Sequence, residues 1–194
     1  KFVDMPTKTT VSEILKEDSE AEVFVPNLFA LGSKAIEKGN AYHKLMQHIN
    51  FDICKKAFVL NDLMGAMSGI LTAEERAYIN VDELARFLRD PITVGLLSRK
   101  LIREQEFIAL MNPPNSKAED GMVLQGIVDL ICEGENDLVI VDYKTNSWTD
   151  ERRYIEHYGK QVEIYARVTG EAMRKKVSKK YLYSFTIGKY IEIK

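Results

Sequence analysis

The sequence predicts an α/β domain built on a small mixed sheet, preceded by a helical region. Three observations support this prediction. Helix-like patterns dominate the first half of the 194 residues. Two apolar segments at residues 122–132 and 138–143 then follow as strand candidates, with a short turn-forming stretch between them. A long amphipathic pattern runs from Asp150 to about Lys176, and strand-like segments close the chain.

The composition is that of a globular domain. Hydrophobic residues make up 45% and charged residues 29%, which excludes a wholly disordered chain. The apolar runs are too short to span a bilayer, and no signal-peptide pattern opens the sequence, so we expect a cytoplasmic protein. The absence of an initiator Met favours a domain taken from a longer polypeptide. Cys54 and Cys132 match no zinc or iron–sulfur spacing, so we expect free thiols.

Charge is distributed unevenly along the chain. The net charge of −2 gives by itself no sign of a nucleic-acid partner. Residues 144–194 nevertheless hold twelve basic and six acidic residues, which leaves −8 for residues 1–143. A basic third of this kind can form a phosphate-binding face, and a solvated helix face is the alternative.

The N-terminal third predicts an arm and then helices. Residues 1–32 are expected to form an irregular arm that ends at Gly32. A helix is predicted from Ser33 to about Ile49, because apolar residues recur there at helical spacing. The residues of that apolar face are Ile36, Leu45, Met46 and Ile49. Residues 61–71 are rich in Gly and Met and predict a loop or a short helix.

Two further helices complete a helical region over residues 33–99. A capping box of Thr72 and Glu75 begins the first. The second follows Asn80 and stops before Pro91, because a proline disfavours helical conformation in the residue before it. Its inward-facing residues are expected to be Leu84, Phe87 and Leu88.

Strands around one long helix are predicted for residues 100–194, which we expect to form the core of the same domain. The predicted strands cover residues 100–111, 122–132, 138–143, 181–187 and 190–193. Consecutive prolines at 113–114 end the first of them. The second and third are joined closely enough to form a hairpin. The helix over residues 150–176 follows the hairpin.

Charged residues with chemical potential lie on this hairpin. Asp142 and Lys144 share one face of their strand, where they follow two apolar residues of the same parity. Asp129 lies on the preceding strand among apolar neighbours, and hairpin pairing could bring it close to Asp142. Two adjacent carboxylates need a cation, and their hard oxygen ligands suit Mg²⁺ or Mn²⁺. An ordinary ion pair of Asp142 with Lys144 remains the alternative.

Four motifs in this order resemble the RecB-type branch of the PD-(D/E)xK nucleases. They are G-x-x-x-H at Gly39–His43, G-x-x-D at Gly126–Asp129, D-Y-K at Asp142–Lys144 and Q-x-x-x-Y at Gln161–Tyr165. Further segments resemble the C-terminal nuclease domain of the AddA helicase–nuclease family. These segments are Glu37–Gly39, Leu71–Glu75, Arg103–Phe107 and Tyr181–Phe185. The resemblance implies a restriction-endonuclease-like core, a small central mixed sheet flanked by helices.

The resemblance also implies roles for individual residues. His43, Asp129 and Asp142 would ligate a catalytic Mg²⁺, for which Mn²⁺ can substitute, and the backbone carbonyl of Tyr143 would be a further ligand. Asp129, Asp142 and Lys144 would be catalytic. Two departures from the family pattern leave these residues in place: no proline precedes Asp129, and Asn40 stands where a threonine often follows the motif glycine.

Supporting and DNA-contacting residues are expected around this set. Gln161 and Tyr165 share a helix face and would support the site or contact DNA. Tyr158 lies on the same face and is expected to pack in the core. Glu106 would face the site or act as a structural carboxylate. Candidates for DNA phosphates are Arg152, Arg153, Lys160 and Arg167, and candidates for base stacking are Trp148 and Tyr154.

The function implied by the resemblance is that of a metal-dependent exonuclease. It would hydrolyse the unwound 3′-ended strand during double-strand-break repair by homologous recombination, in the bacterial cytoplasm at the nucleoid. Expected partners are single-stranded DNA, helicase domains of the same polypeptide and a second, AddB-type subunit. ATP would act only through those helicase domains, because the chain has no P-loop, and no iron–sulfur cluster is expected. The alternatives are a free-standing phage-type exonuclease and a catalytically silent DNA-binding or scaffolding domain.

Overall fold

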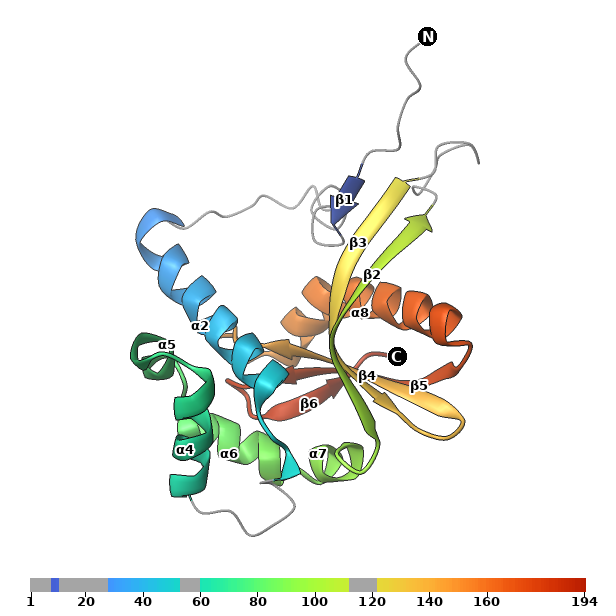
Figure 1. Ribbon diagram of the computed structural model, residues 1–194. Coiled ribbons are helices and arrows are strands. Elements are labelled where there is room, and N and C mark those ends of the chain that lie inside the picture. The colour runs from blue at the N-terminus through green and yellow to red at the C-terminus, as the bar shows by residue number, and fades with distance from the viewer. Residues whose placement is uncertain (1–7, 11–27, 53–59, 112–121) are drawn as a thin grey trace.

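The computed structural model describes residues 8–10, 28–52, 60–111 and 122–194. In this part of the chain, a six-stranded mixed sheet has the N-terminal helices on one side and one long helix on the other (Figure 1). This architecture confirms the predicted α/β fold class. No helix among the described residues is long and apolar enough to cross a membrane.

The predicted helical region is largely confirmed. Its described helices are α2 (Leu28–His48), α4 (Leu60–Ile70), α5 (Ala73–Ala77), α6 (Val81–Arg89) and α7 (Pro91–Leu96). Residues 61–71, predicted as a loop or a short helix, are mostly helical. The capping box is present: the backbone N–H of Glu75 donates to the Thr72 hydroxyl, and the backbone N–H of Thr72 donates to the Glu75 carboxylate.

The short helix α7 was not predicted. Asp90 caps it by accepting a hydrogen bond from the backbone N–H of Ile92 (2.8 Å). Pro91 occupies the first helical position, where the missing N–H of a proline costs nothing because that N–H would be unpaired anyway. The end of α6 before Pro91 is confirmed, and the same proline begins the next helix.

The main strands lie close to their predicted places. They are β2 (Lys100–Met111), β3 (Met122–Glu133), β4 (Asp137–Lys144), β5 (Lys176–Ser184) and β6 (Lys189–Glu192). The β3–β4 hairpin is confirmed. Strands β4 and β5 are parallel, and α8 (Glu151–Met173) provides the crossover that a parallel pair needs. The helix ends before its predicted limit because Arg174 adopts a left-handed conformation (φ 52°), which lets β5 begin before Tyr181.

The prediction of an irregular arm over residues 1–32 is wrong at both places that the structure describes. β1 (Lys8–Thr10) pairs in parallel with Val123–Gln125 of β3, and α2 already begins at Leu28. A strand of three residues is too short to show a period, and its conformation depends on the strand beside it. The predictions that fall outside the described residues concern the rest of this arm, Cys54 and the prolines at 113–114.

The sheet separates two hydrophobic cores. Leu45 belongs to the core under the N-terminal helices, and Ile140 and Val162 belong to the core under α8. The residues predicted to face inward from α6, Leu84, Phe87 and Leu88, are all buried. Cys132 is a buried free thiol, as expected. Ile36, predicted on a buried face, is instead 64% exposed.

Strands β2 and β3 change face together in the middle of the sheet. Alternate residues of a strand share a face, yet Leu130 packs in the first core and Val128 in the second. Strand β2 makes the same change between Leu101 and Phe107. Glu104 has a left-handed φ of 48°. The residues on either side of it pair with Leu130 and Val128, so Glu104 lies opposite Asp129. The change of face therefore occurs at two opposed carboxylates.

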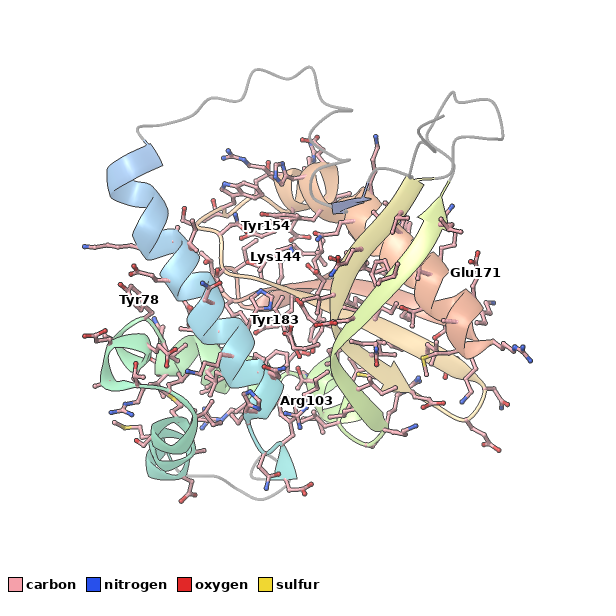
Figure 2. All side chains as sticks on the ribbon, turned by 45° about the horizontal axis from the view of Figure 1, so that its top comes forward. Tyr78, Arg103, Lys144, Tyr154, Glu171 and Tyr183 are labelled. Atoms are coloured by element: carbon pink, nitrogen blue, oxygen red, sulfur yellow. The ribbon has the colours of Figure 1, made fainter. Side chains whose placement is uncertain are left out.

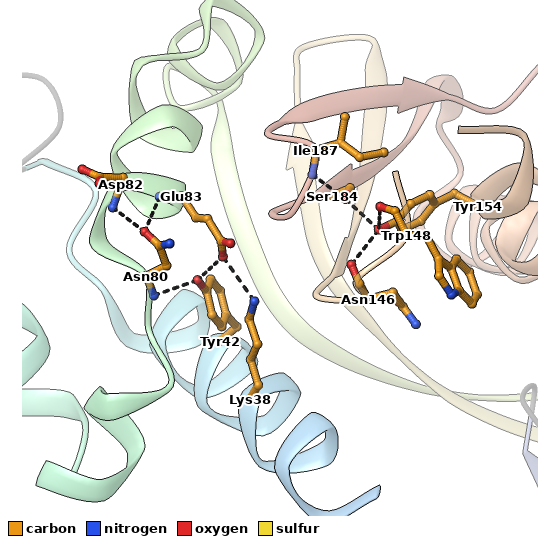
Figure 3. Close-up of polar contacts among 10 residues, drawn as sticks. All are labelled: Lys38, Tyr42, Asn80, Asp82, Glu83, Asn146, Trp148, Tyr154, Ser184 and Ile187. Atoms are coloured by element: carbon orange, nitrogen blue, oxygen red, sulfur yellow. Dashed lines mark hydrogen bonds and ion pairs between the residues drawn. The ribbon is translucent and has the colours of Figure 1, made fainter. Parts of the chain in front are cut away.

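A buried network fixes α2 against α6 (Figure 3). The Tyr42 hydroxyl donates to Glu83 Oε2 (2.5 Å) and accepts from the backbone N–H of Asn80 (3.1 Å). Lys38 Nζ lies 3.4 Å from the same Glu83 oxygen. Burial raises the pKa of Tyr42 well above its usual value, and the bond to Glu83 adds to that effect, so the hydroxyl keeps its proton. Since His43 follows Tyr42, this network also holds the histidine of the G-x-x-x-H motif in place.

We predict that Tyr42→Phe lowers the free energy of unfolding by about 1–3 kcal/mol, because the buried Glu83 carboxylate and the backbone N–H of Asn80 each lose a hydrogen-bond partner. Chemical denaturation of the purified domain measures this change. Tyr78→Phe is the matched control, since the Tyr78 hydroxyl also bonds a glutamate, Glu37, but at the surface. An equal loss for the two variants would contradict the assigned importance of the buried network.

Candidate functional site

Four elements converge where β2 and β3 change face. α2 provides His43, β2 provides Glu104, β3 provides Asp129, and β4 provides Asp142 and Lys144. Figure 2 shows Lys144 near the centre of the molecule, between α2 and the β2–β3 pair. The sequence suggested four of these five residues, and Glu104 is the addition.

His43 lies between two carboxylates. Its Nδ1 atom is 3.4 Å from Asp129 Oδ1 and 3.5 Å from Glu104 Oε1. One ligand atom from each of the three residues lies within 4.8 Å of the others, close enough to share one metal ion. The Asp129 side chain is only 8% exposed and that of His43 is 35% exposed, so the cluster is open to solvent on the histidine side.

Asp129 also ends the pairing of the hairpin. The register between β3 and β4 stops at Leu130 opposite Val141. Beyond that point the backbone N–H of Tyr143 donates to Asp129 Oδ2 (2.7 Å), so a side-chain carboxylate takes the place of a backbone carbonyl. The Tyr143 ring packs in the first core. This packing fixes the backbone of Tyr143, between Asp142 and Lys144, at the edge of the cluster.

Asp142 and Lys144 form a close buried pair. Lys144 Nζ is 2.6 Å from Asp142 Oδ2, and the side chains of Lys144 and Asp142 are 13% and 2% exposed. The ion pair that the sequence left as an alternative to metal binding is therefore present. The two interpretations are compatible, because the charges of Asp129 and His43 also act on Asp142 across the site.

Helix α8 holds the lysine from the other side. Gln161 Oε1 accepts a hydrogen bond from Lys144 Nζ (3.3 Å), and Gln161 Nε2 donates to the Tyr165 hydroxyl (2.8 Å). The two polar residues of the Q-x-x-x-Y motif thus form a chain that ends at the lysine. Tyr158, expected in the core, packs there, and Lys144 Nζ lies 4.2 Å from the centre of its ring.

Glu104, and not Glu106, lies in this cluster. Glu106 is exposed and pairs with Ile127 in the strand register. Strand parity would place both glutamates on the same face, but the left-handed backbone at Glu104 breaks that parity. The residue type gives no signal for this left-handed conformation, because glutamate rarely adopts it.

The charges of the cluster shift the titration of its members. Burial alone would lower the pKa of His43, but Asp129 and Glu104 outweigh it and raise the pKa to about 10. Burial raises the pKa of Asp142 above its usual range, although Lys144 acts against this shift. Burial would lower the pKa of Lys144, but Asp142 and Asp129 raise it above the ordinary value. The histidine and the lysine are therefore both cationic at neutral pH.

The donor set fits a divalent cation. Glu104 Oε1 and Asp142 Oδ2 are buried oxygens without a well-formed hydrogen bond in the described structure, although each lies near a cationic side chain. Buried polar atoms normally have hydrogen-bond partners, and a bound cation would satisfy the two carboxylate oxygens that lack one. Carboxylate oxygens with one imidazole suit Mg²⁺ or Mn²⁺ better than softer metals. The charged forms of His43 and Lys144 offset the repulsion among the three carboxylates.

The basic and aromatic candidates near the site differ in their surroundings. Arg152, Arg153, Lys160 and Arg167 are all exposed on α8. Trp148 is half-buried, with Arg153 over its ring. Tyr154 cannot stack on a base, because it is completely buried and donates from its hydroxyl to the backbone carbonyl of Asn146 (2.9 Å).

Comparison with known proteins points to one family. The sequence pattern of the PD-(D/E)XK nuclease superfamily matches residues 24–190. The chain is 27% identical to an ATP-dependent helicase/nuclease subunit of Lachnoclostridium phytofermentans, over 98% of the chain and 16% of that protein. Proteins of the same name from Ruminiclostridium cellulolyticum and Clostridium novyi are each 28% identical, over 99% and 98% of the chain and 17% and 18% of their own lengths. The chain thus spans less than a fifth of these relatives.

We expect the His43 imidazole to stay protonated in metal-free protein at pH 8, while His157 is neutral, because burial and nearby cations lower the pKa of His157. Histidine resonances followed by NMR in the presence of EDTA measure both values. Since the folded-state pKa of His43 lies above the unfolded value, its contribution to stability is complete below about pH 6.5 and is lost as the pH rises through about 10.

The variant Asp129→Asn provides the check on the cause. It removes one of the two carboxylates beside His43, so the pKa of His43 should fall towards its ordinary value. An unchanged titration in this variant would show that the carboxylate does not control the histidine.

Proposed function

Because the chain belongs to the PD-(D/E)XK nuclease superfamily, we propose that it is the nuclease module of a DNA-processing helicase–nuclease and hydrolyses DNA phosphodiesters with a divalent metal ion. The observation that carries the proposal is the buried Asp142–Lys144 pair at the end of β4, facing the His43–Glu104–Asp129 cluster. Burying so much charge costs folding free energy, and such concentrations of buried charge are typical of functional sites.

In the proposed site, His43, Asp129 and Asp142 bind the metal ion, with Glu104 and the Tyr143 carbonyl as further ligands. Magnesium is the expected ion, with manganese as a substitute. A bound divalent ion would polarise a phosphate oxygen and lower the pKa of water. Asp129 can serve as a ligand through Oδ1, because its Oδ2 atom already accepts the N–H of Tyr143.

Lys144 acts in this proposal as a fixed cation. Its pKa is raised by Asp142 and Asp129, so it holds its proton at neutral pH and does not act as a general base from this state. The ammonium group instead orients water and stabilises charge that develops on the phosphate. Gln161 and Tyr165 restrict its position through their hydrogen-bond chain.

We further propose single-stranded DNA as the substrate and a longer polypeptide as the context. The relatives are named as ATP-dependent helicase/nuclease subunits, and the chain matches less than a fifth of their length. Helicase domains outside this chain would supply unwound DNA and use ATP, and an AddB-type protein would be the partner. Degradation of the 3′-ended strand in recombinational repair is the corresponding role.

Two alternative functions fit these observations less well. A free-standing phage-type exonuclease would use the same residues without a helicase, and the similarity to helicase–nuclease subunits over nearly the whole chain favours the module instead. A silent DNA-binding scaffold would have no need for buried carboxylate oxygens without hydrogen bonds, such as those of Glu104 and Asp142.

We predict that Asp142→Asn lowers metal-dependent cleavage of single-stranded DNA by at least about a hundredfold, because it removes a ligand charge and the partner of Lys144. The rate is measured on a labelled oligonucleotide with Mg²⁺, and EDTA should abolish it in the unchanged protein. Circular dichroism and thermal unfolding confirm that the variant is folded. Cleavage at the original rate by a folded, metal-saturated variant would falsify the assignment.

For metal binding, we predict that Glu104→Gln weakens Mn²⁺ by about ten- to a hundredfold, the range seen when groups that support a metal are removed. Calorimetric titration measures the affinity. Glu106→Gln is the matched control, being the same substitution two residues away on an exposed side chain, and should change the affinity less than about twofold. The opposite order of the two variants would restore Glu106 as the supporting carboxylate.

His43→Ala separates a nuclease from a silent scaffold in the same titration. The proposed site loses Mn²⁺ affinity in this variant, whereas a scaffold has no specific ion for the histidine to bind.

A further inference from the structure

A stack of aromatic rings links the site to the surface of α8. The rings of Trp148 and Tyr158 are nearly parallel, with centres 5.7 Å apart and an angle of 25° between planes. Arg153 places its guanidinium carbon 4.4 Å from the centre of the Trp148 ring. At the other end, Lys144 Nζ lies 4.2 Å from the centre of the Tyr158 ring. Two cations therefore contact one continuous pair of rings.

The loop that carries Trp148 is fixed at its backbone (Figure 3). The buried Tyr154 hydroxyl lies within hydrogen-bond distance of the carbonyls of Asn146 (2.9 Å) and Trp148 (3.1 Å), and Ser184 donates to it from β5. The Tyr158 hydroxyl donates to the Asn146 side chain (3.0 Å). The Trp148 ring thus has a defined position relative to the end of β4, where Lys144 lies.

An exposed histidine lies beside the same stack. His157 contacts the edges of this stack, with its ring centre 5.3 Å from that of Trp148 and 4.7 Å from that of Tyr158. Its pKa is lowered by burial and further by the charges of Lys144 and Arg153. Lys144 and Arg153 therefore both lie close enough to His157 for their charges to act on it.

We propose that Arg153, held over Trp148, binds a backbone phosphate of the DNA strand whose scissile phosphodiester lies at Lys144. The proposal rests on the proposed nuclease function and adds a subsite to it. A guanidinium that lies over a ring uses its face for that contact and keeps its N–H donors in its plane, where they can bind phosphate oxygens in pairs. A ring already contacted by Arg153 and Tyr158 is no open platform for a base, so Trp148 serves to position the arginine.

This assignment differs from the one that the sequence suggested. Arg153 had equal standing with the other basic residues of α8, and Trp148 was a candidate for base stacking. Within the described residues, Arg153 is the basic residue of α8 that lies over a ring. The ligand is a sugar–phosphate backbone and not a particular base, so binding should depend on salt and not on sequence.

The test measures binding without cleavage. A fluorescein-labelled oligothymidylate is titrated with protein in EDTA, and anisotropy gives the dissociation constant at several salt concentrations. For Arg153→Ala we expect about a tenfold weaker affinity, the effect of losing a hydrogen bond to a charged group. The slope of log affinity against log salt should decrease in magnitude by about 0.7, the value for one phosphate contact with a single strand.

Arg174→Asn is the matched control. Arg174 is an exposed arginine at the opposite end of α8, and Asn tolerates its left-handed conformation. This variant loses the same charge at the far end of the helix, so the affinity should stay within about twofold of the original value and the salt slope should not change. Equal losses for Arg153→Ala and Arg174→Asn would overturn the proposal, because they would reflect net charge alone.

Trp148 variants test the positioning role. Trp148→Leu should weaken binding as Arg153→Ala does, and the double variant should be no weaker than either one. Trp148→Phe keeps a ring beneath the guanidinium and should retain most of the affinity. Additive losses in the double variant would show that Trp148 contacts DNA by itself and would overturn its role as a support.

The design separates the subsite from the proposed function. If the unchanged protein binds the oligonucleotide but does not cleave it with Mg²⁺, the nuclease proposal fails while the Arg153 measurement still applies. If it cleaves normally and Arg153→Ala binds as tightly as the original, the subsite fails alone.

Discussion

The site depends on the place where β2 and β3 change face. Glu104 and Asp129 are opposed there, and the pairing of β3 with β4 ends at Leu130, one residue before it would reach Asp129. The Asp129 carboxylate satisfies the N–H of Tyr143 with one oxygen and leaves the other towards His43. In an uninterrupted sheet, a backbone carbonyl would take the place of the Asp129 carboxylate.

The two cores hold this arrangement from both sides. The N-terminal helices bring His43 to the carboxylates through the buried Tyr42–Glu83 contact, and α8 brings Gln161 to Lys144. Burial of so many charges is tolerable because each has an opposite charge or a hydrogen-bond partner nearby. The stacked rings of Tyr158 and Trp148 continue this series of contacts from Lys144 towards the surface, where Arg153 lies.

Much of this structure was predictable from local patterns. Two apolar segments and the short link between them predicted the hairpin, and the resemblance of four motifs to a nuclease family selected His43, Asp129 and Lys144. Glu104 was missed because its role depends on a backbone conformation that breaks strand parity. The burial of Tyr154 could not be predicted either, since its hydroxyl satisfies carbonyls of a loop whose path depends on tertiary contacts. The Asp142–Lys144 ion pair was predicted as an alternative to metal binding. The structure was needed to show that this pair lies beside the cluster of His43, Glu104 and Asp129.

The distribution of the site over the chain has a consequence for biosynthesis. His43 and Gln161 lie far apart in sequence, and contacts between distant segments form late in folding because closing long loops is entropically costly. A chain that is still growing or is cleaved after β4 contains the acidic residues and the lysine but lacks the helix that orders them. In the proposed nuclease, hydrolytic capacity would therefore be acquired only when the fold is complete.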